Sequence, residues 1–103
     1  MPPNFTNPRP NFYQSDAGFS VEVLGRTGLR YVDDKRAMFV DSEVLASPGL
    51  TIATRLGDIK QWDAPHEKET VNEDDRRRIV QNIRLALESQ GFELQVDDEQ
   101  STF

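Results

Sequence analysis

The residues that could carry out chemistry are few, and they gather in the segment His66–Glu69. His66 is the only histidine of the chain, so any serine activated by a histidine base would depend on it. It follows Pro65, and no serine lies in a strand–turn–helix elbow that could place a nucleophile beside it. Because a nucleophile needs an oriented base, the sequence does not favour hydrolysis by covalent catalysis.

A metal or cofactor site is no better supported by the same segment. His66, Glu67 and Glu69 could supply ligands, but they lie in one loop without a second histidine, and the chain contains no cysteine. Most other carboxylates lie at the start of a predicted helix or in the C-terminal tail, where helix capping and solvation account for them. We therefore predict no catalytic residue, no metal and no cofactor.

The distribution of charge indicates a binding surface instead. The net charge is −6, and residues 63–103 contain eleven acidic residues against five basic ones, whereas residues 1–62 are balanced. A protein that binds a phosphate backbone needs the opposite sign, so nucleic acid is a disfavoured partner. No apolar run approaches the roughly 20 residues of a membrane-spanning helix, and the N-terminus does not resemble a secretory signal. We expect a cytoplasmic protein with a protein partner, in keeping with the absence of cysteine.

Trp62, the only tryptophan, admits two interpretations. Its large apolar ring could fill the space between a sheet and the helix. Alternatively, it could lie partly exposed beside Asp63 and Pro65, because tryptophan is enriched at binding hot spots and a stiff loop lowers the entropy lost on binding. One indole could serve both roles through different faces. The predicted partner-binding surface consists of Trp62, Asp63, His66 and Glu67, with Glu73 and Asp74 at its rim.

One convincing helix is predicted between Asn72 and Gly91. Asn72 is a favourable N-cap with Asp75 three residues later, as in a capping box, and Gly91 suits the left-handed conformation that ends a helix. Leu85 points away from the apolar side and is the candidate for a dimer or partner contact, although one exposed leucine is ordinary. The apolar stripe that would pack on a sheet consists of Ile79, Val80, Ile83, Ala86 and Leu87.

The remaining chain predicts strands, because apolar residues alternate with polar ones between turn-forming residues. Short connections favour antiparallel neighbours. The fold class is therefore α+β, a small antiparallel β-sheet of about five strands with one long helix in the C-terminal half packed on one face. The predicted strands are Phe19–Val23, Leu29–Val32, Arg36–Asp41, Leu50–Thr54 and Phe92–Val96, with a further short element at Ile59–Trp62.

Three segments are expected along the chain. Residues 18–97 would form a single domain. Residues 1–17 contain four prolines and three asparagines without an apolar period, which predicts a flexible N-terminal arm that Phe5, Phe12 or Tyr13 could attach to the domain. Residues 98–103 would form an acidic C-terminal tail.

Four local patterns occur in an order that resembles a known family. They are FSVEVLGRTGLRYVDD, AMFVDSEVLASPG, DIKQWDAPHEKE and RRRIVQNIRLALESQGFELQV. Over residues 19–96 they resemble the Immunity protein 74 family of bacterial polymorphic-toxin systems. The most specific pieces are Ile59–Trp62 with Asp63 and Pro65–His66, and Ile79, Asn82 and Ile83 followed by Gln90–Gly91.

The resemblance implies a cytoplasmic, non-catalytic antidote that binds and neutralises a cognate toxin of a polymorphic or contact-dependent system. It assigns no toxin-contacting positions, so the surface predicted above rests on the residues themselves. An acidic surface would suit a basic toxin such as a nuclease, because complementary charge speeds association. The alternative is a structural or adaptor domain that acts through homodimerisation, by a sheet edge or Leu85, or through other protein contacts.

Overall fold

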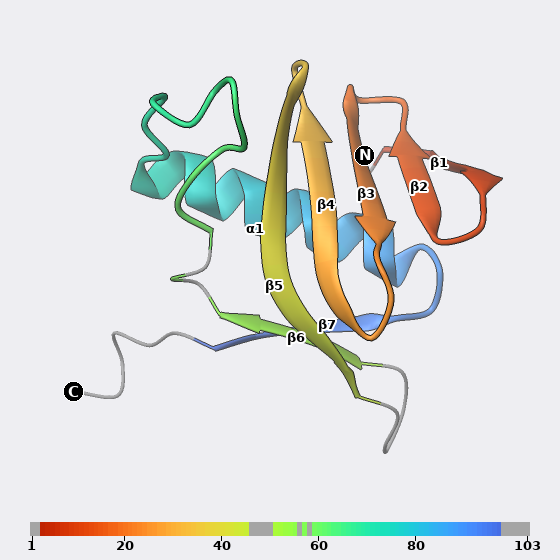
Figure 1. Ribbon diagram of the computed structural model, residues 1–103. Coiled ribbons are helices and arrows are strands. Elements are labelled where there is room, and N and C mark those ends of the chain that lie inside the picture. Colours follow the sequence, from red (N-terminus) through yellow and green to blue (C-terminus); the bar gives the residue numbers. More distant parts are fainter. Residues whose placement is uncertain (1–2, 46–50, 56, 58, 98–103) are drawn as a thin grey trace.

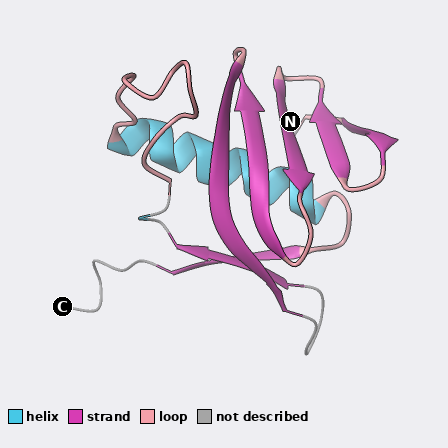
Figure 2. Ribbon diagram, in the orientation of Figure 1, coloured by secondary structure: helices cyan, strands magenta, loops and turns pink. Residues whose placement is uncertain are grey.

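The computed structural model describes residues 3–45, 51–55, 57 and 59–97, which form a curled seven-stranded sheet and one helix (Figures 1 and 2). The order of strands in the sheet follows the order of the chain. All neighbouring strands are antiparallel except the last pair, which is parallel. The elements are β1 (Phe5–Arg9), β2 (Phe12–Ser15), β3 (Phe19–Val23), β4 (Thr27–Asp33), β5 (Arg36–Leu45), β6 (Thr51–Arg55), α1 (Glu73–Glu88) and β7 (Glu93–Asp97).

The long strand β5 joins the two halves of the sheet. Arg36–Val40 and, beyond a register shift, Glu43 pair with β4, whereas Ser42–Leu45 pair with β6 on the other side. In Figure 1, β5 curves so that β6 and β7 run crosswise below β3, β4 and β5, and α1 crosses behind these three strands. One face of β3–β5 is therefore covered by the helix, and the other remains open.

The core lies between α1 and the covered face of the sheet. Full burial of an apolar side chain of this size contributes about 1.5–3 kcal/mol, so this layer supplies most of the stability. The predicted apolar stripe of the helix is confirmed, with burial of Ile79, Ile83, Ala86 and Leu87 and partial burial of Val80. Opposite it lie the buried strand residues Val21, Leu29, Tyr31, Met38, Val40, Ile52 and Leu94.

Both predicted helix ends have the expected chemistry. The Asn72 side chain accepts a hydrogen bond from the Asp75 N–H at 2.8 Å, and the Asp75 carboxylate accepts one from the Asn72 N–H at 3.3 Å, which completes the capping box. The helix ends at Glu88, and Gly91 has the left-handed φ of 86°. Arg76 faces inward and donates from Nε to the Ile59 carbonyl at 2.9 Å, so the start of the helix is tied to the segment before it.

The sheet is larger than the predicted five strands because residues 5–15, expected in a flexible arm, form the hairpin β1–β2. Tyr13 is only 5% exposed, and the rings of Phe5 and Phe19 meet edge-on with centroids 5.8 Å apart. Pro8 lies in the outermost strand and Pro10 in the turn that follows it, where the missing N–H leaves no ladder bond unmade. The prolines in the sequence favoured the prediction of a flexible arm, although apolar side chains attach this hairpin to the core.

One further expectation about the sheet was wrong. The sheet is not wholly antiparallel, because α1 acts as a crossover connection and returns the chain parallel to β6. The short element expected at Ile59–Trp62 contributes an isolated bridge between Gln61 and Thr70. Leu50, the expected start of a strand, lies outside the described residues, and the strand itself is confirmed as β6.

Leu85, the candidate for a dimer or partner contact, is half-buried. Among the described residues, the large apolar side chains that remain exposed are Leu24 and Phe39, at 47% and 51%. Both lie in or beside the strands and not on the helix.

Candidate functional site

Residues 59–70, called loop 59–70 below, lie along the free edge of β5. The Asp63 N–H donates to the Ala37 carbonyl at 2.8 Å, and the Asp63 carboxylate accepts from the Phe39 N–H at 3.3 Å. These contacts satisfy backbone groups of β5 that β6 does not reach, and an open strand edge would otherwise invite pairing with another chain. Asp63 therefore fixes the loop to the sheet as well as presenting a charge.

Trp62 lies beneath this loop and belongs to the core. Its side chain is 1% exposed, and its ring stacks on Tyr31 with centroids 6.2 Å apart. The Arg36 guanidinium lies 4.3 Å from the centroid of the indole, a cation–π contact. The indole Nε1 has no hydrogen-bond partner among the described residues. Of the two interpretations, the structure therefore favours packing, and Trp62 presents almost no area to a partner.

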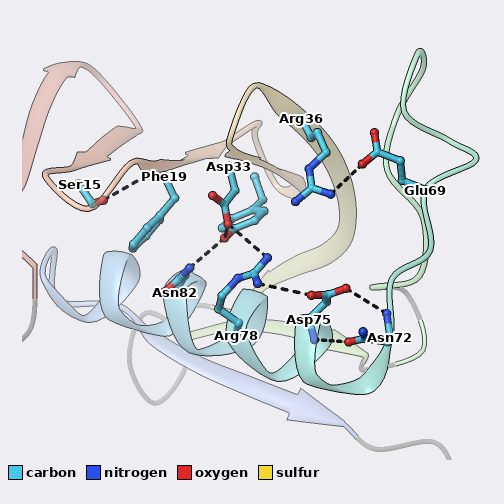
Figure 3. A network of polar contacts seen from close by, with 10 residues as sticks. Ser15, Phe19, Asp33, Arg36, Glu69, Asn72, Asp75, Arg78 and Asn82 are labelled. Atoms are coloured by element: carbon cyan, nitrogen blue, oxygen red, sulfur yellow. Dashed lines mark hydrogen bonds and ion pairs between the residues drawn. The ribbon is translucent and has the colours of Figure 1, made fainter.

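Three polar side chains, those of Arg36, Glu69 and His66, continue in sequence from the tryptophan. Arg36 donates from Nη1 to Glu69 Oε1 at 3.0 Å, and the second oxygen of Glu69 contacts His66 Nδ1 (Figure 3 shows the first contact). The hydrogen bond with His66, and to a smaller degree that with Arg36, lowers the pKa of the exposed Glu69 carboxyl. His66 thus helps to hold the loop in place, and its side-chain contact among the described residues is with the Glu69 carboxylate.

Asp63 and Glu67, two of the predicted binding residues, line the same shallow hollow of about 300 Å³. Both are exposed, and Glu67 has no ion pair within the described part of the chain. The hollow also contains residues that the sequence did not single out. Its lining consists of Phe39, Lys60, Gln61, Trp62, Asp63, Ala64 and Glu67.

Trp62 also lines this hollow, but the other three residues of the predicted surface lie apart from it. His66 is half-exposed and faces Glu69. Glu73 and Asp74 are exposed in the first turn of α1, and Glu73 pairs with Arg77 at 3.6 Å. The helix dipole favours acidic residues at this position, so their presence has a structural explanation too. None of the three lines the hollow.

A second open hollow, of about 410 Å³, lies between the β4–β5 turn and α1, and residues of a polar network form part of its lining (Figure 3). Asn82 donates to the Tyr31 hydroxyl at 2.9 Å, and this hydroxyl donates to the Asp33 carboxylate at 2.8 Å. Arg78 lies 3.6 Å from Asp33 and 3.4 Å from Asp75. Since the charges of Asp33 and Arg78 neutralise each other, we assign this network a structural role, in which it connects β4 to α1.

The protonation of Tyr31 supports that assignment. Burial raises the pKa of the Tyr31 hydroxyl well above its ordinary value, and the hydrogen bond and negative charge of Asp33 act in the same direction. The hydroxyl therefore keeps its proton and donates it to Asp33 under physiological conditions. The Tyr31 hydroxyl thus keeps its proton in the hydrogen bond to Asp33 and is not suited to proton transfer.

Comparison with protein families decides the kind of protein. The model of the family Immunity protein 74 matches residues 20–97. The chain belongs to this family. This match confirms the resemblance noted in the sequence. Immunity proteins neutralise toxins and are generally not enzymes. Comparison with curated proteins and with solved structures gives no match.

No described helix is long and apolar enough to cross a membrane. No group of three or more histidine, cysteine, aspartate or glutamate side chains in the described ranges could hold a metal ion. Phe39, which lines the hollow together with Asp63 and Glu67, is the residue of this hollow that sequence reasoning missed. The signal was present, because Met38 and Val40 face the core and the residue between them must face outward.

Proposed function

We propose that this immunity protein binds a cognate bacterial toxin through loop 59–70 and the adjoining part of β5. It would act stoichiometrically, in the cytoplasm of the cell that produces a polymorphic or contact-dependent toxin. Membership of the family supports toxin neutralisation in general. The observation that supports this particular surface is the fixed position of Asp63 and Glu67 around one exposed hollow.

The attachment of the loop supports binding because a rigid surface loses little entropy on association. Asp63 holds the loop to β5 through two hydrogen bonds, and Arg36 holds it again through Glu69. Within the loop, the His66 N–H donates to the Asp63 carbonyl and the Glu69 N–H to the His66 carbonyl, at 2.9 and 3.0 Å. The loop is therefore ordered before a partner arrives.

Charge supports a basic partner. Glu67 and Asp74 have no ion pair among the described residues, so their fields are not cancelled locally. A toxin with a positive surface would associate faster with such a face, and wrong partners of like charge would be rejected. Neutralisation would follow if the bound protein covers the toxin's active site.

Co-expression tests the proposal. The neighbouring gene's toxin domain is expressed in a sensitive host with and without this protein, and the two purified proteins are mixed and measured by calorimetry. We expect restored growth and a complex of defined stoichiometry. Lack of both, with a toxin domain that is active alone, would contradict the proposed function.

A further inference from the structure

Two large apolar side chains lie near Gly28, away from the face of the sheet that α1 covers. Phe39 and Leu24 expose 51% and 47% of their surfaces, whereas Met38 and Val40 on either side of Phe39 are fully buried. Both approach Gly28, where an added Cβ would lie 2.8 Å from Phe39 Cε1 and 3.6 Å from Leu24 Cδ1. We call Leu24, Gly28 and Phe39 the outer apolar patch.

A structural role explains only part of this arrangement. Gly28 has a φ of +92°, which favours glycine, and an aromatic ring packed over a strand glycine shields its backbone. That contact uses one edge of the Phe39 ring and leaves about half of the side chain in water. Exposed apolar surface of this kind has an unfavourable hydration free energy, and it is typical of residues that a partner buries.

The patch is continuous with the surface proposed above. Phe39 belongs to the lining of the hollow that contains Asp63 and Glu67, and its N–H donates to the Asp63 carboxylate at 3.3 Å. Its backbone is also paired with Arg30 of β4. The aromatic side chain therefore stands on a fixed backbone between two strands and an ordered loop, which is the setting of a binding anchor.

The charges around the patch indicate the chemistry of its partner. Asp41 and Glu43 are the next exposed positions along β5, and neither has an ion pair among the described residues. With Asp63 and Glu67 they outnumber the three neighbouring bases, Arg26, Arg30 and Lys60. A complementary surface would carry an apolar group for the centre and lysine or arginine side chains for the rim.

We propose that the outer apolar patch is the centre of the toxin-docking surface, with Phe39 as its anchor and the acidic residues of β5 and loop 59–70 as its rim. The occupant is a basic protein surface with an apolar side chain that packs on the Phe39 ring. This inference rests on the proposed function, which could hold with a different docking surface.

The test measures the affinity of the purified toxin domain for wild type, Phe39→Ala and Leu85→Ala. Removal of a central aromatic anchor typically weakens binding by about 30-fold or more. We expect such a loss for Phe39→Ala and an affinity within about twofold of wild type for Leu85→Ala, which is a half-buried apolar control on the helix. Thermal melting checks that each variant is folded.

A charge variant keeps the test decisive if Phe39→Ala does not fold. Asp41→Lys leaves the ring in place and should weaken binding by about tenfold, with most of the effect in the association rate. Wild-type affinity for both Phe39→Ala and Asp41→Lys would overturn the inference while the proposed function stands. Failure of the wild type to bind would overturn the proposed function itself. A homodimer in light scattering that Phe39→Ala dissolves would assign the patch to self-association and overturn toxin docking there.

Discussion

Trp62 helps to position loop 59–70, since its buried ring contacts both the Tyr31 ring and the Arg36 guanidinium. Arg36 continues to Glu69, and Glu69 to His66, so the loop residues are placed through one buried side chain. The exposed loop residues thus depend for their position on the buried Trp62. Substitution of Trp62 should therefore affect stability, whereas substitution of an exposed loop residue should affect binding.

The first prediction concerns Trp62→Ala. Removal of a fully buried aromatic side chain costs about 3–5 kcal/mol, a large part of the ~5–15 kcal/mol that stabilises a typical domain. Trp62→Phe should cost only about 1–2 kcal/mol, because it keeps the stacking on Tyr31 and removes an indole N–H without a described acceptor. Urea denaturation measures both. Unchanged stability of Trp62→Ala together with lost toxin binding would contradict the core role and support a direct contact of Trp62 with the partner.

Asp63 combines an acceptor for the Phe39 N–H with a charge, and two substitutions separate these roles. Asp63→Asn keeps the acceptor oxygen, so its free energy of unfolding should stay within about 0.5 kcal/mol of wild type while association with a basic toxin slows. Asp63→Ala should also lose about 1 kcal/mol of stability, because the Phe39 N–H loses its partner. Denaturation and surface plasmon resonance give the two quantities. Equal stability of both variants would contradict the role in fixing the loop.

At the scale of elements, the contact between β4 and α1 depends on Tyr31, Asp33, Asn82 and Arg78. Burial raises the pKa of Tyr31 above the value of about 10 for an unfolded chain. The folded state therefore holds this proton more tightly, so the stabilisation is complete below about pH 10 and is lost as the pH rises toward the folded pKa.

We accordingly predict that the free energy of unfolding decreases between about pH 9 and about pH 11, and that the decrease is smaller in Tyr31→Phe. Part of the decrease should remain in this variant, since burial also raises the pKa of Tyr13. Chemical denaturation at a series of pH values measures the slopes. Identical slopes for the two proteins would show that Tyr31 ionises as it does in the unfolded chain.

The elements differ in how far the sequence determines them. The helix and strands β3, β4 and β5 were predicted because caps, turns and periodicity are local properties. The β1–β2 hairpin was missed because its prolines and asparagines resemble a flexible segment, while its burial depends on a distant contact of Phe5 with Phe19. The parallel pairing of β6 with β7 depends on where the helix returns the chain, which no local pattern encodes.

At the scale of the whole molecule, the candidate site was predictable only where neighbours in sequence become neighbours in space. Asp63 and Glu67 are four residues apart and line one hollow. Phe39 joins them from a strand more than twenty residues earlier, through the bond from its N–H to Asp63. Helix dipole and capping explain Glu73 and Asp74 without a partner, so acidity alone did not identify the surface.

The last prediction uses the net charge of −6, which attracts a basic toxin from every side, whereas a docking surface attracts it locally. Salt screens exposed charges over about 8 Å at physiological ionic strength, so the association rate should fall with added salt while dissociation changes little. Glu67→Lys should reduce this salt dependence.

Glu88→Lys changes the net charge equally at the opposite end of α1 and should leave the salt dependence close to wild type. Stopped-flow kinetics over a series of salt concentrations compares the two variants. If Glu88→Lys acts as strongly as Glu67→Lys, the overall charge steers the toxin and loop 59–70 has no privileged part in the encounter. If only Glu67→Lys acts, the acidic rim guides the toxin to the hollow beside Phe39.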